Sequence, residues 1–220
     1  MRTICLLYLL AATAAFGQDN PNQQDIVQRL MPNGTPAVLH LPTPVDKPRV
    51  IGLLRVKQVR ATGKQAQQVA YLLAILGSEY PTNRGTLVND LRRCTAKPVR
   101  ECDGDTAAFV IDLFQRGDET LLRPLFDAGL AGDNPASKVL GNFYVDLITK
   151  NPGKYLDGLR TYPPLLQRDI CAMAGKGDGS GLTPAQLQTV RTRLSGIGSP
   201  PARACLTAVE GAAAQRSTAH

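Results

Sequence analysis

The residues that most often carry out catalysis are few and scattered in this chain. Its two histidines are His40, in a proline-rich stretch, and His220, the final residue, and neither lies beside a plausible nucleophile in sequence. A Gly-x-Ser-x-Gly elbow, a His-Glu-x-x-His helix and a Gly-x-x-x-x-Gly-Lys phosphate loop are all missing. This argues against triad hydrolases, metallopeptidases and nucleotide-dependent enzymes, and we expect neither a metal nor a cofactor.

An enzymatic function would have to depend on carboxylates, and Glu79 is the best candidate. Glycosidases cleave their substrate with a pair of carboxyl groups about 5–9 Å apart. Glu79 follows an apolar helical stretch and precedes Tyr80-Pro81, a place where a chain can turn at the edge of a cleft. A solvated loop glutamate explains the same position more simply. General-acid catalysis by Glu79 is therefore the alternative and not the main prediction.

Three aspartates raise the question of ligand binding. Asp112 and Asp146 hold equivalent places in two apolar stretches, where they either face a ligand or, more simply, lie on an exposed face. Asp178 belongs to Lys176-Gly-Asp-Gly-Ser-Gly-Leu-Thr-Pro, which invites comparison with a calcium loop. Neither possible register supplies enough oxygen ligands for calcium. We therefore predict a flexible hairpin loop, followed by a helix that is capped at Thr183-Pro184.

The cysteines predict two disulfides. Four remain after removal of an export signal, namely Cys94, Cys102, Cys171 and Cys205. An even number in an oxidising compartment indicates disulfides, and proximity in sequence favours Cys94–Cys102 with Cys171–Cys205 among the three possible pairings. No pair has the two-to-four-residue gap of a zinc knuckle, which disfavours a thiolate metal site.

Residues 1–17 have the form of a cleavable signal peptide. Arg2 gives a positive start, Ile4 to Ala15 is apolar apart from Thr13, and Ala15 and Gly17 are small residues before a cut at Gln18. The apolar run is about 12 residues, whereas a transmembrane helix needs about 20. We expect a secreted or periplasmic protein with no transmembrane segment after cleavage.

Charge is concentrated in one part of the chain. Residues 46–100 hold eleven Lys and Arg against three acidic residues, whereas 101–220 are close to neutral. A basic surface attracts polyanions, although a solvated face that keeps the protein soluble is the simpler reading. We expect the partner to be an acidic protein or a polyanionic envelope component and not nucleic acid. The candidate contacts are Arg55, Lys57, Arg60, Arg92, Arg93 and Arg100.

Glycine, proline and apolar spacing predict an all-α fold. A Pro-rich segment (18–48) precedes a helical domain (49–213), and a polar tail (214–220) is expected to be disordered. Residues 49–60 favour a helix, although their β-branched residues also allow a strand. The other expected helices are 65–76, 86–93, 105–116, 119–130, 136–149, 153–161, 164–174, 184–195 and 200–213, and glycines such as Gly175 mark their ends.

The helical part also repeats itself. Phe109-Val-Ile-Asp-Leu-Phe114 matches Phe143-Tyr-Val-Asp-Leu-Ile148, 34 positions further along, and Cys171 and Cys205 are the same distance apart. This period predicts stacked helical hairpins, with the two cysteines on successive units. In period and hydrophobic spacing the chain resembles the HEAT and armadillo class of repeats. The resemblance implies an irregular HEAT-like array, and a compact helical bundle is the alternative.

These observations together predict an exported, non-enzymatic interaction or scaffold protein. Its helical repeats would offer a surface for a partner, and its basic N-terminal half would supply the contacts. The alternative is a small exported hydrolase of cell-wall glycan, with Glu79 as the general acid.

Overall fold

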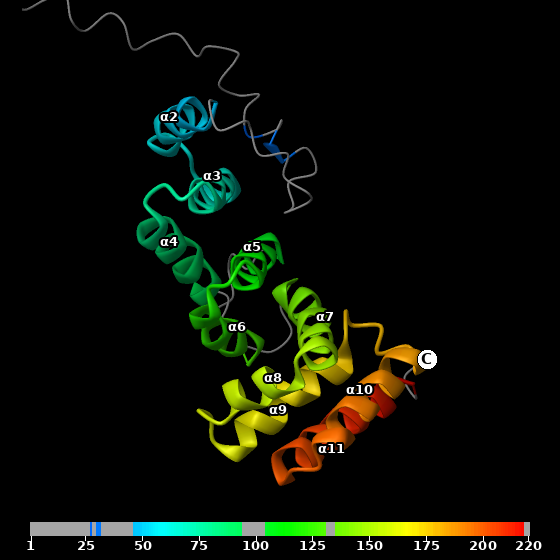
Figure 1. The fold of residues 1–220 in the computed structure, drawn as a ribbon. Coiled ribbons are helices and arrows are strands. Elements are labelled where there is room, and N and C mark those ends of the chain that lie inside the picture. Colours follow the sequence, from blue (N-terminus) through cyan, green and yellow to red (C-terminus); the bar gives the residue numbers. More distant parts are fainter. Residues whose placement is uncertain (1–26, 28–29, 32–45, 94–103, 131–134, 218–220) are drawn as a thin grey trace, which may run out of the picture.

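The computed structural model describes residues 27, 30–31, 46–93, 104–130 and 135–217, and every regular element in these ranges is a helix (Figure 1). The all-α prediction is therefore confirmed. The predicted signal peptide and most of the Pro-rich segment lie outside the described residues. The elements are α2 (Lys47–Gln58), α3 (Gly63–Ile75), α4 (Tyr80–Arg93), α5 (Gly104–Gln115), the 3-10 turn η1 (Glu119–Leu121), α6 (Leu122–Gly129), α7 (Pro135–Lys150), α8 (Pro152–Leu159), α9 (Pro164–Lys176), α10 (Pro184–Ile197) and α11 (Pro200–Ser217).

The stretch that was ambiguous between helix and strand forms α2. Pro48 lies in its first turn, where a missing N–H costs nothing. Val50 and Leu54, four residues apart, are buried together, and α2 packs chiefly against α3. In a strand, Val50, Gly52 and Leu54 would all lie on the same face. In the helix, Val50 and Leu54 share the buried face and Gly52 lies on the exposed side.

The helices advance from α2 at one end of the molecule to α10 and α11 at the other (Figure 1). Two alternating sets of helices follow the sequence period. One set comprises α3, α5, α7, α9 and α11, and each of its members packs against the next. The other comprises α4, α6, α8 and α10. α3 with α4 and α7 with α8 pack as hairpins, as the period predicted, whereas the arrangement changes at α9 and α10.

Burial follows the same period. Phe109 of α5 and Phe143 of α7 are both buried, and so are Leu125 of α6 and Leu159 of α8. Leu91 in α4, one period before Leu125, is fully buried as well. Equivalent positions therefore face the same core in successive units.

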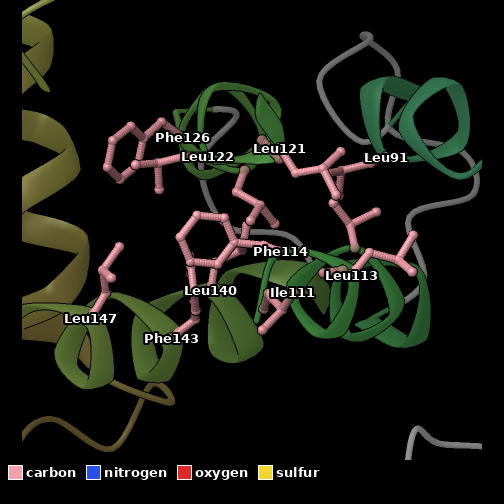
Figure 2. Close-up of a cluster of buried hydrophobic side chains, with 14 of the residues drawn as sticks. Leu91, Ile111, Leu113, Phe114, Leu121, Leu122, Phe126, Leu140, Phe143 and Leu147 are labelled. Carbon is pink, nitrogen blue, oxygen red and sulfur yellow. The ribbon is translucent and has the colours of Figure 1, made fainter. Parts of the chain in front are cut away.

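The core is continuous between neighbouring units. Figure 2 shows side chains from α4, α5, η1, α6 and α7 meeting in one cluster, which includes Phe114 and Phe143. Their rings lie edge to face, with centroids 5.4 Å apart. Each hairpin thus closes its apolar side only with the help of the next one, which is the behaviour expected of stacked repeats.

Two details of the C-terminal part differ from the sequence prediction. Gly175 lies inside α9 and does not end it; the helix continues to Lys176, and Gly177 follows at a φ of 56°. A side chain at 175 would overlap the carbonyl oxygen of Val209, so this glycine allows α9 and α11 to approach closely. Consequently α9 packs mainly on α11, and α10 packs on α11 and α7 instead of forming a simple pair with α9.

The last helix is also longer than expected. α11 continues to Ser217, past Ala213, where the sequence analysis ended it. Upstream of α2, Val27 and Met31 are buried against the core, and the Met31 N–H donates to the Val27 carbonyl at 2.8 Å. None of the helices in the described ranges has the length and hydrophobicity that crossing a lipid bilayer requires.

Candidate binding groove

A cavity of about 620 Å³ opens between α5, α7 and the loop that joins α9 to α10. Part of its wall is formed by three pairs of residues that are one period apart in the sequence. Each pair contributes one side chain from α5 and the equivalent one from α7: Ala108 with Asn142, Ile111 with Val145, and Asp112 with Asp146. We call this cavity the α5–α7 groove. Its size is in the range of sites that hold small molecules or short chain segments.

The α5 side of the groove is fixed by hydrogen bonds. Tyr71 of α3 donates its hydroxyl to Asp112 Oδ2 at 2.7 Å, and Arg116 donates to the same oxygen. The Tyr71 ring stacks on Phe109 at 4.6 Å. Burial, and then the Asp112 carboxylate, raise the pKa of Tyr71 far above its usual range, so the phenol remains a donor. Asp112 is thereby held in one orientation.

Asp146 is less constrained than its repeat partner. Its carboxylate accepts a hydrogen bond from Lys150 at 3.0 Å, one turn along α7. Both side chains are more than half exposed. An exposed pair of this kind contributes only about 0.3–0.5 kcal/mol. A charged or polar group on a ligand can therefore compete for Asp146 at little cost.

The third wall is the loop between α9 and α10. Asp178 accepts from the Ser180 amide at 3.0 Å and from its hydroxyl, and these bonds lower the pKa of the Asp178 carboxyl. Thr183 caps α10 together with Gln186 in a reciprocal pair of bonds, as the sequence predicted for this helix start. Asp178, Ser180, Gly181, Thr183 and Gln186 all line the groove.

Gly141 holds this loop against α7. A Cβ at position 141 would overlap the carbonyl oxygen of Gly177, so only glycine lets the loop approach α7 this closely. Gly179 lies beside the Lys138 side chain on the same helix. The loop is therefore seated on α7, and its predicted flexibility stays a prediction. Within the described ranges, no group of three or more His, Cys, Asp or Glu side chains is arranged to hold a metal ion.

The predicted basic residues do not form one patch. Arg55, Lys57 and Arg60 lie at the end of α2, which meets the beginning of α4: Arg55 pairs with Glu79 at 2.8 Å, and Gln58 donates to Asn83. Arg92 and Arg93 lie at the other end of α4, about 20 Å away at about 1.5 Å per residue. Arg100 is outside the described residues.

Part of the basic surplus is also neutralised by acids of the following unit. Lys64 of α3 pairs with Asp105 of α5, and Arg84 of α4 pairs with Asp118 at 2.6 Å. Arg93 pairs within its own helix, with Asp90 at 3.2 Å. The charge asymmetry of the sequence is therefore weaker on the folded surface than the residue counts indicate.

Glu79 begins the turn into α4 in an unusual backbone conformation. Its φ is 48°, a left-handed value that no other non-glycine residue adopts in the described ranges. Its side chain is half exposed and is paired with Arg55, and it does not line the α5–α7 groove. This setting resembles the solvated glutamate that was the simpler reading of the sequence.

The predicted disulfide Cys171–Cys205 joins α9 to α11, with the Cα atoms 5.3 Å apart. It links equivalent positions of successive units, as the sequence period predicted. Both cysteines are buried. Cys94 and Cys102 lie outside the described residues, so their pairing stays a prediction.

Sequence reasoning found two of the three carboxylates of the groove. Asp112 and Asp146 were identified by the period, although an exposed face was preferred for them. Asp178 was considered only as a calcium ligand, because nothing local shows that its loop folds back onto α7. Gly141, a glycine in the middle of α7, was the residue in the sequence that could have indicated the close approach of this loop.

Over the described residues the protein is all-α, and the α5–α7 groove lies between neighbouring helices of the array. Comparisons with protein families, with curated proteins and with solved structures find no match to this chain.

Proposed function

We propose that this protein is a non-enzymatic interaction protein, and that it binds a segment of its partner in the α5–α7 groove. The observation that carries the proposal is the repetition of the groove lining with the period of the helical hairpins. Stacked helical repeats present such rows of equivalent side chains to extended ligands. A row from two units, closed by a third wall, suits a chain that lies along the stack.

The chemistry of the lining favours a polypeptide with cationic side chains. Gln115, Asn142 and Gln186 carry amides, which both donate and accept hydrogen bonds as a peptide backbone does. Ile111 and Phe143 give apolar contact. The carboxylates of the groove offer charge-assisted bonds to lysine or arginine, which are stronger than neutral ones.

We also propose that the protein acts outside the cytoplasm. The disulfide between Cys171 and Cys205 suits an oxidising compartment. Together with the signal peptide predicted for residues 1–17, it supports a secreted or periplasmic location. We therefore expect the partner to be another protein of the envelope or of the secreted fraction.

Selection of peptides from a displayed random library tests the groove. The oxidised protein should enrich peptides that contain lysine or arginine, and the variant Asp112→Asn/Asp146→Asn should bind the same peptides about tenfold or more weakly. Asp157→Asn/Asp169→Asn, which removes two exposed carboxylates outside the groove, is the matched control and should retain binding. Glu79→Gln should also retain it.

Two results would refute the proposal. Enriched peptides that bind the groove variant as well as the parent would show that the groove is not the site. Turnover of a cell-wall glycan that is abolished by Glu79→Gln would establish the hydrolase alternative instead.

A further inference from the structure

We propose a second interaction surface: the outward face of α2 docks on an anionic phospholipid bilayer. At about 100° per residue, the side of α2 opposite Val50 and Leu54 is one stripe of exposed residues. We call this stripe the α2 outer face; it consists of Arg49, Gly52, Arg55, Val56, Val59 and Arg60. The valines lie at its centre, with Arg49 and Arg60 on one side and Arg55 on the other.

The valines are the unusual part of this face. Val59 is 86% exposed and Val56 is 51% exposed. Few large apolar side chains among the described residues are as open to solvent. The end unit of a helical stack normally has a polar outer face, because nothing packs on it. α2 occupies that end position in the described chain (Figure 1), yet its outer face is apolar at the centre. Such a face indicates contact with a further surface.

The charges around the valines select an anionic surface. Residues 47–60 contain five basic residues and no acidic ones, and Asp46 precedes them. Glu79 is an acidic side chain brought against this face, through its pair with Arg55, in which both side chains are about half exposed. Exposed pairs are weak, so Arg55 can exchange Glu79 for a lipid phosphate.

A bilayer fits this combination better than a free polyanion does. Anionic headgroups attract each lysine or arginine near the surface, and apolar side chains between the cations enter the headgroup boundary. A soluble polyanion would use the arginines but would gain nothing from Val56 and Val59. The large exposed fractions of Val56 and Val59 allow a surface to reach them.

Co-sedimentation with vesicles tests the proposal. The intact oxidised protein should bind vesicles of phosphatidylglycerol and phosphatidylcholine in equal parts, and not vesicles of phosphatidylcholine alone. Arg49→Gln/Arg60→Gln should lower the partition coefficient about 25-fold, or about fivefold for each cation. Val56→Ser/Val59→Ser should lower it about fivefold or more. Arg168→Gln/Arg193→Gln, which removes two exposed cations of α9 and α10, should leave it unchanged.

The other outcomes would overturn the proposal. Equal binding to both vesicle types would remove the role of charge. Binding that is lost in the arginine variant but unchanged in the valine variant, together with equal affinity for polyglutamate, would identify a plain polyanion site. Asp112→Asn/Asp146→Asn should bind vesicles like the parent, so a failure of the groove proposal remains distinct from a failure of this one. Unfolding midpoints within the range of the control variant ensure that folded proteins are compared.

Discussion

At the scale of single residues, the groove depends on Gly141, which has no side chain. Gly141 lies inside α7, where glycine normally lowers helix stability by about 0.5–1 kcal/mol relative to alanine. Its compensation is the contact with the carbonyl of Gly177, which positions Asp178 and Ser180 in the groove. The loss of helix stability at Gly141 is offset by the position that it allows for the loop between α9 and α10, which lines the proposed binding site.

We predict that Gly141→Ala destabilises the protein by about 1–3 kcal/mol, because the added methyl group collides with backbone that cannot rotate away. It should also weaken peptide binding in the groove. Gly85→Ala in α4 is the matched control: apart from its sequence neighbours and the nearby backbone of its own helix, no atom lies within 4 Å of the new Cβ, so it should stabilise the protein by about 0.5–1 kcal/mol. Urea unfolding measures both changes, and equal effects of the two variants would contradict this account.

This residue also shows where sequence reasoning stops. The equivalence of Asp112 and Asp146 is visible in the sequence because helical period and repeat period are both local patterns. The contact of Gly141 with Gly177 joins segments that are distant in the sequence and leaves no periodic trace. The pairing of Arg55 with Glu79 is hidden for the same reason, although both were singled out as candidates.

At the scale of elements, the joints between successive hairpins are built from tyrosine and aspartate. Tyr80 at the start of α4 donates to Asp118 at 2.6 Å, and Tyr162 donates to Asp127 of α6 at 2.7 Å. Asp118 also accepts from Arg84 and lies just before η1. Apolar spacing predicted where the helices lie, since burial repeats every three or four residues. It could not predict these joints, because they depend on how helices cross.

The Asp118 joint makes stability depend on pH. Burial alone would raise the pKa of Asp118, but hydrogen bonds from Thr120, Tyr80 and Arg84 outweigh it and lower the pKa below its ordinary value. A carboxyl whose pKa is lower in the folded state stabilises the protein in full above its unfolded pKa, and this contribution is lost as the pH falls through the folded pKa.

We therefore predict that Asp118→Asn is about 1–2 kcal/mol less stable than the parent at pH 7, and that the difference shrinks as the pH falls below about 4. Urea midpoints between pH 7 and pH 2 give both curves. Asp157→Asn on α8 should change stability by about 0.5 kcal/mol or less throughout, because its pair with Arg160 is exposed. A difference for Asp118→Asn that stays constant with pH would show that the effect is steric.

At the scale of the whole molecule, the sequence left open whether the helices form an array or a compact bundle. The described helices pack chiefly on their neighbours in the stack, and α2 packs chiefly on α3. At the other end, α9 and α11 are each other's most extensive partners and are joined by Cys171–Cys205. In an array of this kind, stability varies along the stack, because each unit adds its own interface.

We predict that amide hydrogen exchange reports this gradient, with the least protection in α2 and the most in α9 and α11. Cys171→Ala/Cys205→Ala removes a cross-link between cysteines at a sequence separation of 34, for which loop-closure entropy gives about 3–4 kcal/mol. Protection in α9 to α11 should then fall by about 100- to 1,000-fold, while α2 to α4 change by less than about threefold. The variant is preferable to a reducing agent because it leaves Cys94 and Cys102 untouched.

If the slowest amides of all helices instead lose protection together, the chain unfolds as one cooperative bundle. The sequence period would then describe the packing of the helices but not independent units of stability.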